Sequence, residues 1–469
     1  MGMQELDRFI ARVRELPGLE VLTAQEDLLL SAHGTYPVEY KWMRQGPYPR
    51  VPGAVVRPAD TAAVSAALRA ASDERVAVIP VGGGSGIVGG TMAEARQVLI
   101  DTRLMTSFSL EPDNCTVIAG CGLTCAELEE RLGRRGFTAG QFPQSAHSAT
   151  LGGMAATRAV GTFSSRYGKM DDMVTGLEVV LPGGRILRTH PAPKRSSGPE
   201  LMQLFLGSEG TLGVITEVSM KVYRVPESRL FRTCVFPDTA SGLRAIRRFI
   251  QDGARPAVVR LYDETESVEW LSKLGLPPGG CFLVLVFEGP DGLVRAEEEL
   301  TLRACRGEGA REHGPDGAAL WFEGRFATRK MLEYHRTRGR TADAVEVAAP
   351  WDRIETVWRG MRAALLPLCT EVDCHFSHFY HTGASVYVIF YADTGSDDAA
   401  AELRYRECLK LAIDASLAHG GNVSHHHGIG RSKAAWMEAE HGPAGLEVLR
   451  SIKRALDPHG IMNPGVLDL

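Results

Sequence analysis

Three consecutive histidines, His425, His426 and His427, precede a Gly-Ile-Gly turn near the end of the chain. Imidazole titrates near neutral pH, so it can act as an acid, a base or a metal ligand. One histidine in such a turn is usually an exposed polar residue, but three in a row before two glycines favour a functional site. The triplet therefore predicts acid–base chemistry.

A tyrosine is the second candidate for chemistry. Tyr380 stands just before the glycine turn at Gly383 and the apolar stretch 386–391, which is typical of a strand. A phenol in this position can face a pocket and carry a proton if a neighbouring imidazole or a cofactor lowers its pKa from about 10. The alternative is a core tyrosine that serves packing alone.

Glycine-rich segments occur at three places, residues 80–91, 140–153 and 207–215. Glycines let backbone N–H groups converge on a diphosphate, because no Cβ stands in the way. Small residues over such lengths also let a flat aromatic ring lie against the backbone. Each segment alone could be a surface loop, but three in this order favour a nucleotide cofactor.

The first of these segments contains a G-x-G-x-x-G match at Gly84, Gly86 and Gly89, which alone would suggest a dinucleotide-binding βαβ unit. That interpretation fails on length. A parallel crossover usually needs a dozen or more residues including a helix, and the stretch 90–97 is too short for one.

Apolar periodicity predicts the elements that position these residues. Up to Pro226, strands are expected at 54–58, 76–81, from 98, 116–119 and 211–223, with a hairpin over 177–187 and helices over 61–71 and 124–133. After Pro226, long helices separate buried strands, which is typical of an α+β fold. There we expect helices at 240–252, 291–305 and 350–367, strands at 281–287 and 386–391, and an exposed loop at 305–318.

The fold class is therefore α+β, and we expect four parts. They are a helical N-terminal lead-in (1–49), a cofactor-binding domain (50–225), a substrate-facing cap domain (226–420), and a C-terminal segment (421–469) that carries the histidines and returns to the cofactor-binding domain.

Composition excludes several classes of protein. The chain has 469 residues and a net charge of −5, which argues against nucleic acid as a partner because phosphate binding needs concentrated Lys and Arg. The nine cysteines are scattered without a C-x-x-C pair, so we expect reduced thiols and no metal site. No apolar run is long enough to cross a bilayer, and neither a secretory nor a peroxisomal signal is evident. We expect a cytoplasmic protein.

The three glycine-rich segments resemble the FAD-binding domain of the vanillyl-alcohol oxidase superfamily, also called PCMH-type. In that superfamily they wrap an extended FAD, and many members bond the flavin covalently through a histidine in the first segment. Here Ser85 stands in that loop, so the resemblance implies noncovalent FAD; His147 is a poor candidate for a link. The residues implied as FAD contacts are Pro80, Val81, Gly82, Gly83, Gly84, Ser85, Gly86, Gln144, Ser145, Ala146, His147, Ser148, Ala149, Thr150, Thr157, Arg158, Ala159, Val160, Glu209, Gly210, Thr211, Leu212, Gly213, Val214 and Ile215.

Other segments are similar to the alkylglycerone-phosphate synthase (alkyl-dihydroxyacetone-phosphate synthase) family, whose members make the ether bond of ether lipids. The similar segments are Arg260–Asp263, Ala349–Arg353, Tyr380–Tyr387 and Ser424–Gly430. The histidine triplet with the tyrosine segment is the specific part, and the likeness extends from about residue 50 to the end. His381 and Ser385 depart from the pattern, since better-known members carry Asp and Cys there.

The resemblance implies roles for individual residues. Tyr380 would accept or donate the proton at the carbon next to the substrate ketone, and the three histidines would shape and protonate the same site. Arg260 would be needed for activity. Arg336 would bind substrate, since a guanidinium fork suits a phosphate. For either arginine the alternative is a surface salt bridge.

The implied reaction exchanges the acyl group of acyl-dihydroxyacetone phosphate for a fatty alcohol, without net redox change. The flavin N5 atom would bind the substrate carbon, expel the fatty acid and then yield the carbon to the alcohol, which divides one hard exchange into two displacements. The implied partners are a lipid-phosphate substrate and a fatty alcohol, with peripheral contact to a membrane. A homodimer is a further expectation.

An FAD-dependent 2-hydroxy-acid dehydrogenase or oxidase, of the D-lactate or glycolate type, is the alternative from the same superfamily. Those relatives hold a metal between histidines of an H-x-G-D-G-N-x-H stretch. The matching stretch here, His381–Tyr387, has no Asp and ends on tyrosine, so a second ligand is missing. A flavin-binding or lipid-binding module without catalysis is the third class.

Overall fold

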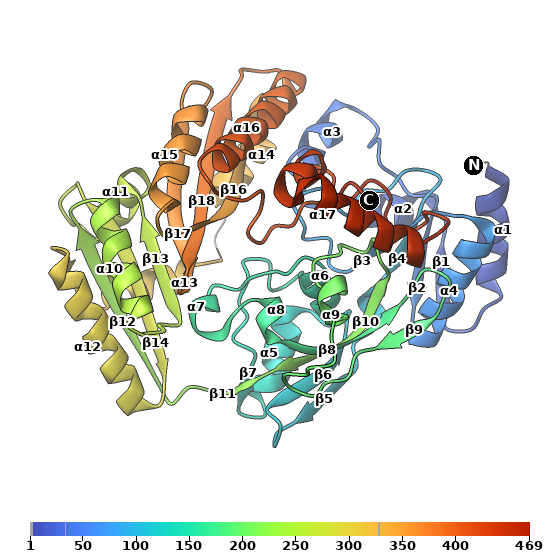
Figure 1. Ribbon diagram of the computed structural model, residues 1–469. Coiled ribbons are helices and arrows are strands. Elements are labelled where there is room, and N and C mark those ends of the chain that lie inside the picture. Colours follow the sequence, from blue (N-terminus) through green and yellow to red (C-terminus); the bar gives the residue numbers. More distant parts are fainter. Residues whose placement is uncertain (1–2, 33, 327–328) are drawn as a thin grey trace.

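The computed structural model describes residues 3–32, 34–326 and 329–469. It holds two parts that mix helices and sheets, each around its own large hydrophobic core (Figure 1). We call the part around the first core the N-terminal part and the seven-stranded sheet with its helices, on the left of Figure 1, the cap. The expected α+β class is confirmed. Residues 1, 2 and 33 of the predicted lead-in lie outside the described residues.

The N-terminal part begins with a four-stranded sheet. Its elements are β1 (Leu19–Leu22), β2 (Ala54–Pro58), α4 (Thr61–Glu74), β3 (Val78–Val81) and β4 (Val98–Asp101). The strand order is β1-β2-β4-β3, and β2 and β3 both pair parallel with β4. Helix α4 begins after Asp60, whose side chain accepts a hydrogen bond of 2.8 Å from the N–H of Ala63. Sequence had predicted this helix to end a few residues earlier.

The link between β3 and β4, residues 82–97, consists of turns and bends without a helix. The dinucleotide-binding βαβ unit is therefore absent from these described residues. The two strands nevertheless pair in parallel, so the expectation that this stretch is too short for a parallel crossover was wrong. An extended glycine-rich loop spans the same distance that a helix usually spans.

A second, antiparallel sheet completes the N-terminal core in the order β5-β6-β10-β8-β9. Its strands are β5 (Phe108–Glu111), β6 (Thr116–Gly120), β8 (Val174–Val180), β9 (Ile186–Arg188) and β10 (Val214–Lys221). The predicted strand 211–223 starts only at Val214, because residues before it form a turn, and its end becomes β11 (Tyr223–Arg224), paired with β7 (Phe137–Thr138).

Short helices lie in the connections of this part. They are α5 (Cys125–Gly133), α6 (Leu151–Ala156), α7 (Ser164–Tyr167), α8 (Met170–Met173) and α9 (Met202–Phe205). Helix α5 begins at a capping box, in which the Thr124 hydroxyl accepts from the N–H of Glu127 and the Glu127 carboxylate accepts from the N–H of Thr124.

The cap is a seven-stranded antiparallel sheet in the order β15-β12-β14-β13-β17-β18-β16. Its strands are β12 (Ser228–Phe236), β13 (Val258–Tyr262), β14 (Cys281–Gly289), β15 (Arg311–Glu312), β16 (Arg340–Pro350), β17 (Glu371–Phe379) and β18 (Gly383–Asp393). One face packs on α10 (Thr239–Gln251), α12 (Asp291–Gly307), α15 (Ile354–Leu365) and α16 (Asp398–Ala418). The opposite face packs on α11 (Glu264–Lys273), α13 (Asp316–Gly324) and α14 (Arg329–Arg336).

Some elements differ from the sequence prediction. The stretch 305–318 is not one loop, since it holds the end of α12, the edge strand β15 and the start of α13. The helix expected at 350–367 begins only at Ile354, because Pro350 still belongs to β16. The lead-in contains helices α1 (Met3–Arg14), α2 (Gln25–Ala32) and α3 (Glu39–Gln45), but also strand β1, which sequence analysis missed.

The C-terminal segment returns to the N-terminal part. After α17 (Met437–Leu456), the tail forms a bridge with β3, in which Val78 donates to the carbonyl of Ile461 and Asn463 donates to the carbonyl of Val78. Figure 1 shows this red segment running from the cap across the first sheet. The histidine triplet therefore lies on a chain segment that connects the two parts.

Candidate active site

Tyr380 and the histidine triplet meet at the end of the cap sheet. Tyr380 is in the turn between β17 and β18, where its N–H donates to the carbonyl of Gly383 at 2.8 Å. Its hydroxyl lies 2.8 Å from Nε2 of His425. Although 45 positions separate the two residues, the fold gives them a direct hydrogen bond.

The histidine segment is fixed along the free edge of β16. His425 N–H donates to the carbonyl of Glu346, and Asn422 N–H donates to the carbonyl of Ala348. The segment thus satisfies backbone groups that the edge strand would otherwise expose.

The Glu346 side chain anchors the same segment. Its carboxylate accepts from the backbone N–H groups of His426 (3.1 Å) and His427 (2.7 Å), from the Ser424 hydroxyl, and from Lys433 Nζ (2.8 Å). Nδ1 of His427 lies 3.2 Å from the carboxylate, close enough for charge attraction but not aligned as a hydrogen bond. Burial opposes the charge of Glu346, yet His427 and Lys433 hold its pKa well below the usual value. This carboxylate is ionised at neutral pH.

The rings of His425 and His426 continue the hydrogen-bonded chain. Their Nδ1 atoms are 2.8 Å apart, so one ring donates to the other. Burial lowers the pKa of both imidazoles well below the usual value, so both are neutral. If Tyr380 donates to Nε2 of His425, then His425 carries its own proton on Nδ1 and donates to His426. A proton can pass along this row in either direction by exchanging donors and acceptors.

Among the described residues, no neighbouring imidazole lowers the pKa of Tyr380. Burial raises the pKa of this phenol far above 10, and the carboxylates of Asp172 and Asp171 add to the effect. The imidazoles of His425 and His426 are neutral and supply no positive charge that would offset this rise in pKa. Tyr380 is therefore a neutral hydroxyl at rest, suited to donating a proton and to receiving it back.

Arg260 is joined to the triplet through aromatic side chains. Its Nη2 lies 2.7 Å from Nε2 of His375, whose Nδ1 lies 2.9 Å from the Glu266 carboxylate. The ring of Tyr387 stacks on His375 with centroids 4.5 Å apart, and on His426 with centroids 5.9 Å apart. Strand register explains this row, since Tyr387 is the cross-strand partner of His375 on one side and of Glu346 on the other.

Arg336 does not join this group. It is the last residue of α14, its side chain is exposed, and the charge that it places nearby acts on Tyr40 of α3. No contact with Tyr380, Arg260 or the triplet is found for it among the described residues. Its assignment to substrate binding stays a prediction.

The first glycine-rich loop has the form of a phosphate cradle. A Cβ on Gly82 would lie 2.0 Å from Oγ1 of Thr150, and one on Gly83 would lie 1.6 Å from the carbonyl oxygen of Ser148, so neither position accepts a side chain. Within the part of the chain that the structure describes, the N–H groups of residues 83–87 have no acceptor. Oγ1 of Thr150 is likewise buried without a partner. These groups fit the diphosphate of FAD.

The other predicted segments meet the first one. Residues 148–150 pack on Gly82 and Gly83, and Gly210 is so close to Pro80 that a Cβ there would be 2.9 Å from its ring. Arg158 is held by backbone carbonyls at Gln203 and Leu206, which leaves its guanidinium turned to the protein. The individual FAD contacts stay predictions, but the three segments do form one surface.

Glu209 links this surface to the histidine segment. Its carboxylate accepts from the N–H groups of Ile429 (2.7 Å) and Gly430 (2.9 Å), and burial raises its pKa to about 7. Asn463 of the tail donates to the carbonyls of Gly90 (3.0 Å) and Glu209 (2.7 Å). Glu209 was predicted as a cofactor contact, but its side chain serves to position the loop after the triplet.

Sequence reasoning missed several residues of the site. They are Lys169, His375, His378, Glu346, Lys433 and Asn463. A signal existed for Glu346, which is an acidic residue within the apolar run 344–349 and so demands a buried partner. Lys169 had no such signal, because only the fold brings its Nζ to 2.7 Å from the carbonyl oxygen of His425.

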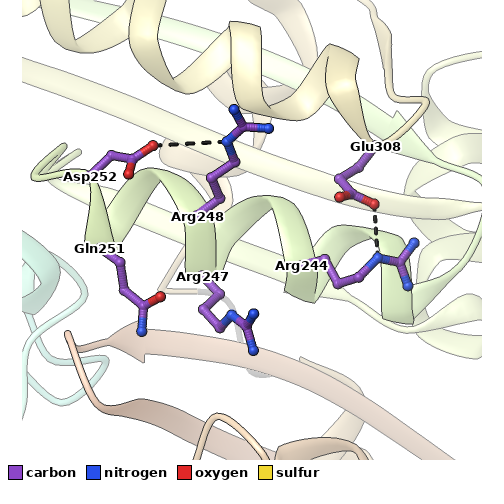
Figure 2. A pocket seen from close by; sticks show the side chains of 6 residues that line it. All are labelled: Arg244, Arg247, Arg248, Gln251, Asp252 and Glu308. Atoms are coloured by element: carbon purple, nitrogen blue, oxygen red, sulfur yellow. Dashed lines mark hydrogen bonds and ion pairs between the residues drawn. The ribbon is translucent and has the colours of Figure 1, made fainter.

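A cleft of about 280 Å³ opens beside Tyr380, between the N-terminal part and the cap. Its lining includes Ser164 and Tyr167 of α7, Arg255, and the turn residues Phe379 and His381. Tyr380 itself also lines this cleft. A second hollow, of about 260 Å³, lies on the solvent side of α10 (Figure 2).

Arginines dominate the hollow on α10. Arg244 pairs with Glu308 at 2.8 Å and Arg248 lies 3.9 Å from Asp252, as Figure 2 shows. For Arg247, also drawn there, no ion pair is found among the described residues.

Within the described residues, no three His, Cys, Asp or Glu side chains converge as a metal ion would require. In the described chain, no helix has both the length and the apolar character to cross a membrane.

Comparison with known proteins follows this geometry. Residues 52–190 match the family of FAD binding domains, and residues 225–467 match the C-terminal domain of FAD linked oxidases. A Caenorhabditis elegans protein named alkyldihydroxyacetonephosphate synthase is 30% identical, over 92% of this chain and 79% of that protein. A protein named D-lactate dehydrogenase from Archaeoglobus fulgidus is 29% identical, over 88% of this chain and 90% of that protein.

A solved structure shows the same arrangement. The crystal structure of an alkyldihydroxyacetonephosphate synthase superposes with a TM-score of 0.79 at 25% identity, and the match covers 99% of this chain and 85% of that one. The predicted resemblance and the PCMH-type fold are thus confirmed.

Proposed function

Because the chain belongs to the family of FAD-linked oxidases with a PCMH-type FAD-binding domain, we propose that it exchanges the acyl group of acyl-dihydroxyacetone phosphate for a fatty alcohol. The chain binds FAD. The observation that carries the proposal is the 2.8 Å hydrogen bond between Tyr380 and His425, which joins the two segments most specific to the similar synthases. The proposal thus rests on a pair of residues and not on the fold alone.

When bound, FAD supplies a ring that can accept an electron pair from the substrate and return it. The chain's own residues then handle protons and charge. Tyr380 holds a proton at its hydroxyl, and His425 and His426 accept it or replace it without a buried charge arising at rest. Arg260 keeps a permanent positive charge beside this row, which suits a phosphate-bearing substrate. Tyr380 also lines the cleft between the N-terminal part and the cap.

Oxidation of a 2-hydroxy acid is the second candidate, since a relative named D-lactate dehydrogenase matches at nearly the same identity. The two activities differ in one observable. Alkyl exchange leaves the flavin oxidised at the end of each turnover, whereas oxidation of a 2-hydroxy acid leaves it reduced and bleached until an acceptor reoxidises it.

The deciding experiment uses FAD-loaded protein under anaerobic conditions. One sample receives acyl-dihydroxyacetone phosphate with labelled hexadecanol, and another receives D-lactate or glycolate. Labelled ether product with a fatty acid released in equal amount, and no bleaching by the hydroxy acids, is the expected result. Bleaching without ether product would replace the proposal by the second candidate. Tyr380→Phe serves as the control for chemistry at this site.

We also propose peripheral contact with a membrane, because the substrates of the proposed reaction are long-chain lipids. The exposed arginines of α10 support it, since each basic residue near an anionic surface contributes about 1 kcal/mol to binding. Arg247 is the best placed of them, because Arg244 and Arg248 have acidic neighbours.

A further inference from the structure

A fourth histidine, His378, stands at the end of β17 in an unusual backbone conformation. The pairing of β17 with β18 shifts register between Ser377 and Phe379, so His378 is the extra residue of a β-bulge. Its φ is +55°, in the left-handed region that a non-glycine residue rarely adopts. Such conformations persist where the surroundings impose them, and they concentrate at functional sites.

Three contacts hold the His378 ring in the buried interior. Nδ1 lies 2.6 Å from the hydroxyl of Ser164 on α7, which belongs to the N-terminal part. The ring lies nearly parallel to that of His425, at 16° with centroids 5.4 Å apart, and it meets His426 edge-on at 5.2 Å. The bulge turns this side chain onto the triplet, and α7 fixes it there.

We propose that His378 is a positioning residue for His425. In this proposal the Ser164 hydroxyl donates to Nδ1 and the His378 proton is on Nε2, while the flat contact keeps the His425 ring oriented with Nε2 toward Tyr380. Without a neighbour on that face, the His425 ring could rotate and lose its alignment with the Tyr380 hydroxyl. The inference rests on the proposed acid–base function of Tyr380 and His425.

Charged and titratable groups around His378 and His425 make the proposal testable through the pH dependence of kcat. The groups that face it are Lys169, Arg260, His375, His426, His427 and Glu346. Burial, with Lys169 and His378 itself, lowers the pKa of His425. A smaller side chain at position 378 admits water and removes the contribution of the His378 ring to the low pKa of His425. The pKa of His425 then rises, and the acid limb of the kcat profile moves to higher pH.

His378→Asn is the informative variant, because Asn tolerates the left-handed conformation and removes the ring. We expect kcat for ether formation to fall about tenfold or more, as misalignment of a catalytic group can produce. KM and the visible FAD spectrum should stay close to the wild type. Ser164→Ala removes the partner of His378 Nδ1, so kcat should fall less than in His378→Asn, and the acid limb of the kcat profile should move in the same direction. His441→Asn, an exposed histidine on α17, is the matched control and should change neither.

A measurement without substrate separates this inference from the proposed function. In FAD-loaded protein labelled with ¹⁵N-histidine, the signal lost in His378→Asn should report a bare Nδ1 and a protonated Nε2. The His425 signal should titrate at higher pH in both His378→Asn and Ser164→Ala.

These signals with no ether product would count against the proposed reaction only. A protonated Nδ1 on His378, or an unchanged His425 titration in both variants, would overturn the inference. If His378→Asn fails to fold, Ser164→Ala decides by the same titration.

Discussion

Tyr380→Phe is the sharpest test of the candidate site, because it removes one hydroxyl and keeps the ring. In the wild type that hydroxyl lies 2.8 Å from Nε2 of His425, in a buried setting. The variant leaves this imidazole nitrogen without its partner, which costs about 1–3 kcal/mol of unfolding free energy. For a domain of the size of the cap we expect the melting temperature to fall by a few degrees, at roughly 2–4 °C per kcal/mol.

The effect on turnover should be much larger than the effect on stability. A positioned acid–base group contributes about 10²–10⁴-fold to rate, so kcat should fall by at least roughly 100-fold. FAD should stay bound, since the glycine-rich segments are unchanged. Stopped-flow and steady-state assays of ether formation, with the visible flavin spectrum and urea unfolding, measure the three quantities on one preparation.

Tyr405→Phe is the control for stability. Its hydroxyl is buried and donates to Oδ2 of Asp343 at 2.9 Å, on the face of the cap sheet that packs on α16. It should lose unfolding free energy while kcat stays near that of the wild type. The reasoning is refuted if Tyr380→Phe keeps most of its activity, or if it loses activity only through loss of FAD. It also fails if Tyr405→Phe lowers kcat as strongly.

The remaining predictions concern the cofactor, the anchor of the histidine segment and the membrane. With Ser85 in the first loop, acid precipitation should release all flavin, and colour left on the pellet would show a covalent link. Glu346→Gln should lower the unfolding free energy at pH 7 by about 3–5 kcal/mol, since it unpairs buried Lys433. Because the pKa of Glu346 is depressed in the folded state, its contribution is present above about pH 4.5 and is lost as the pH falls further, so the two proteins should converge in acid; a constant difference from pH 7 to 3 would contradict this. The protein should float with anionic vesicles at low salt and less so with Arg247→Glu, whereas equal flotation of both would exclude α10 as the contact.

The sequence predicted features that depend on interactions between residues close together in the chain. The helices predicted at 61–71 and 124–133 are present, and each begins after a residue, Asp60 or Thr124, whose side chain accepts from a backbone N–H of the first turn. The glycine-rich loops were visible because only glycine allows the close backbone approach found at Gly82 and Gly83. The pairing of Tyr380 with the triplet came from resemblance, since nothing local in either segment points to the other.

The sequence could not show features that depend on strand register or on the packing of distant segments. His378 faces the triplet only because a bulge shifts the register of β17, and no pattern of residue types records a bulge. The pKa of Tyr380 likewise depends on burial. Burial lowers the pKa of the His425 and His426 imidazoles well below the usual value, so these two rings carry no positive charge that could lower the pKa of Tyr380. Burial is a property of the assembled fold.

The histidine segment is anchored to both parts of the molecule. At one end the Glu346 carboxylate of the cap accepts hydrogen bonds from the N–H groups of His426 and His427. At the other end the Glu209 carboxylate of the N-terminal part accepts hydrogen bonds from the N–H groups of Ile429 and Gly430. A Cβ on Gly430 would lie 2.2 Å from the carbonyl oxygen of a valine in the first glycine-rich loop, so the segment lies directly on the loop that fits FAD. Any shift of the cap relative to that loop must pull on one carboxylate or the other. The two anchors therefore hold the Tyr380–His425 pair in register with the first glycine-rich loop.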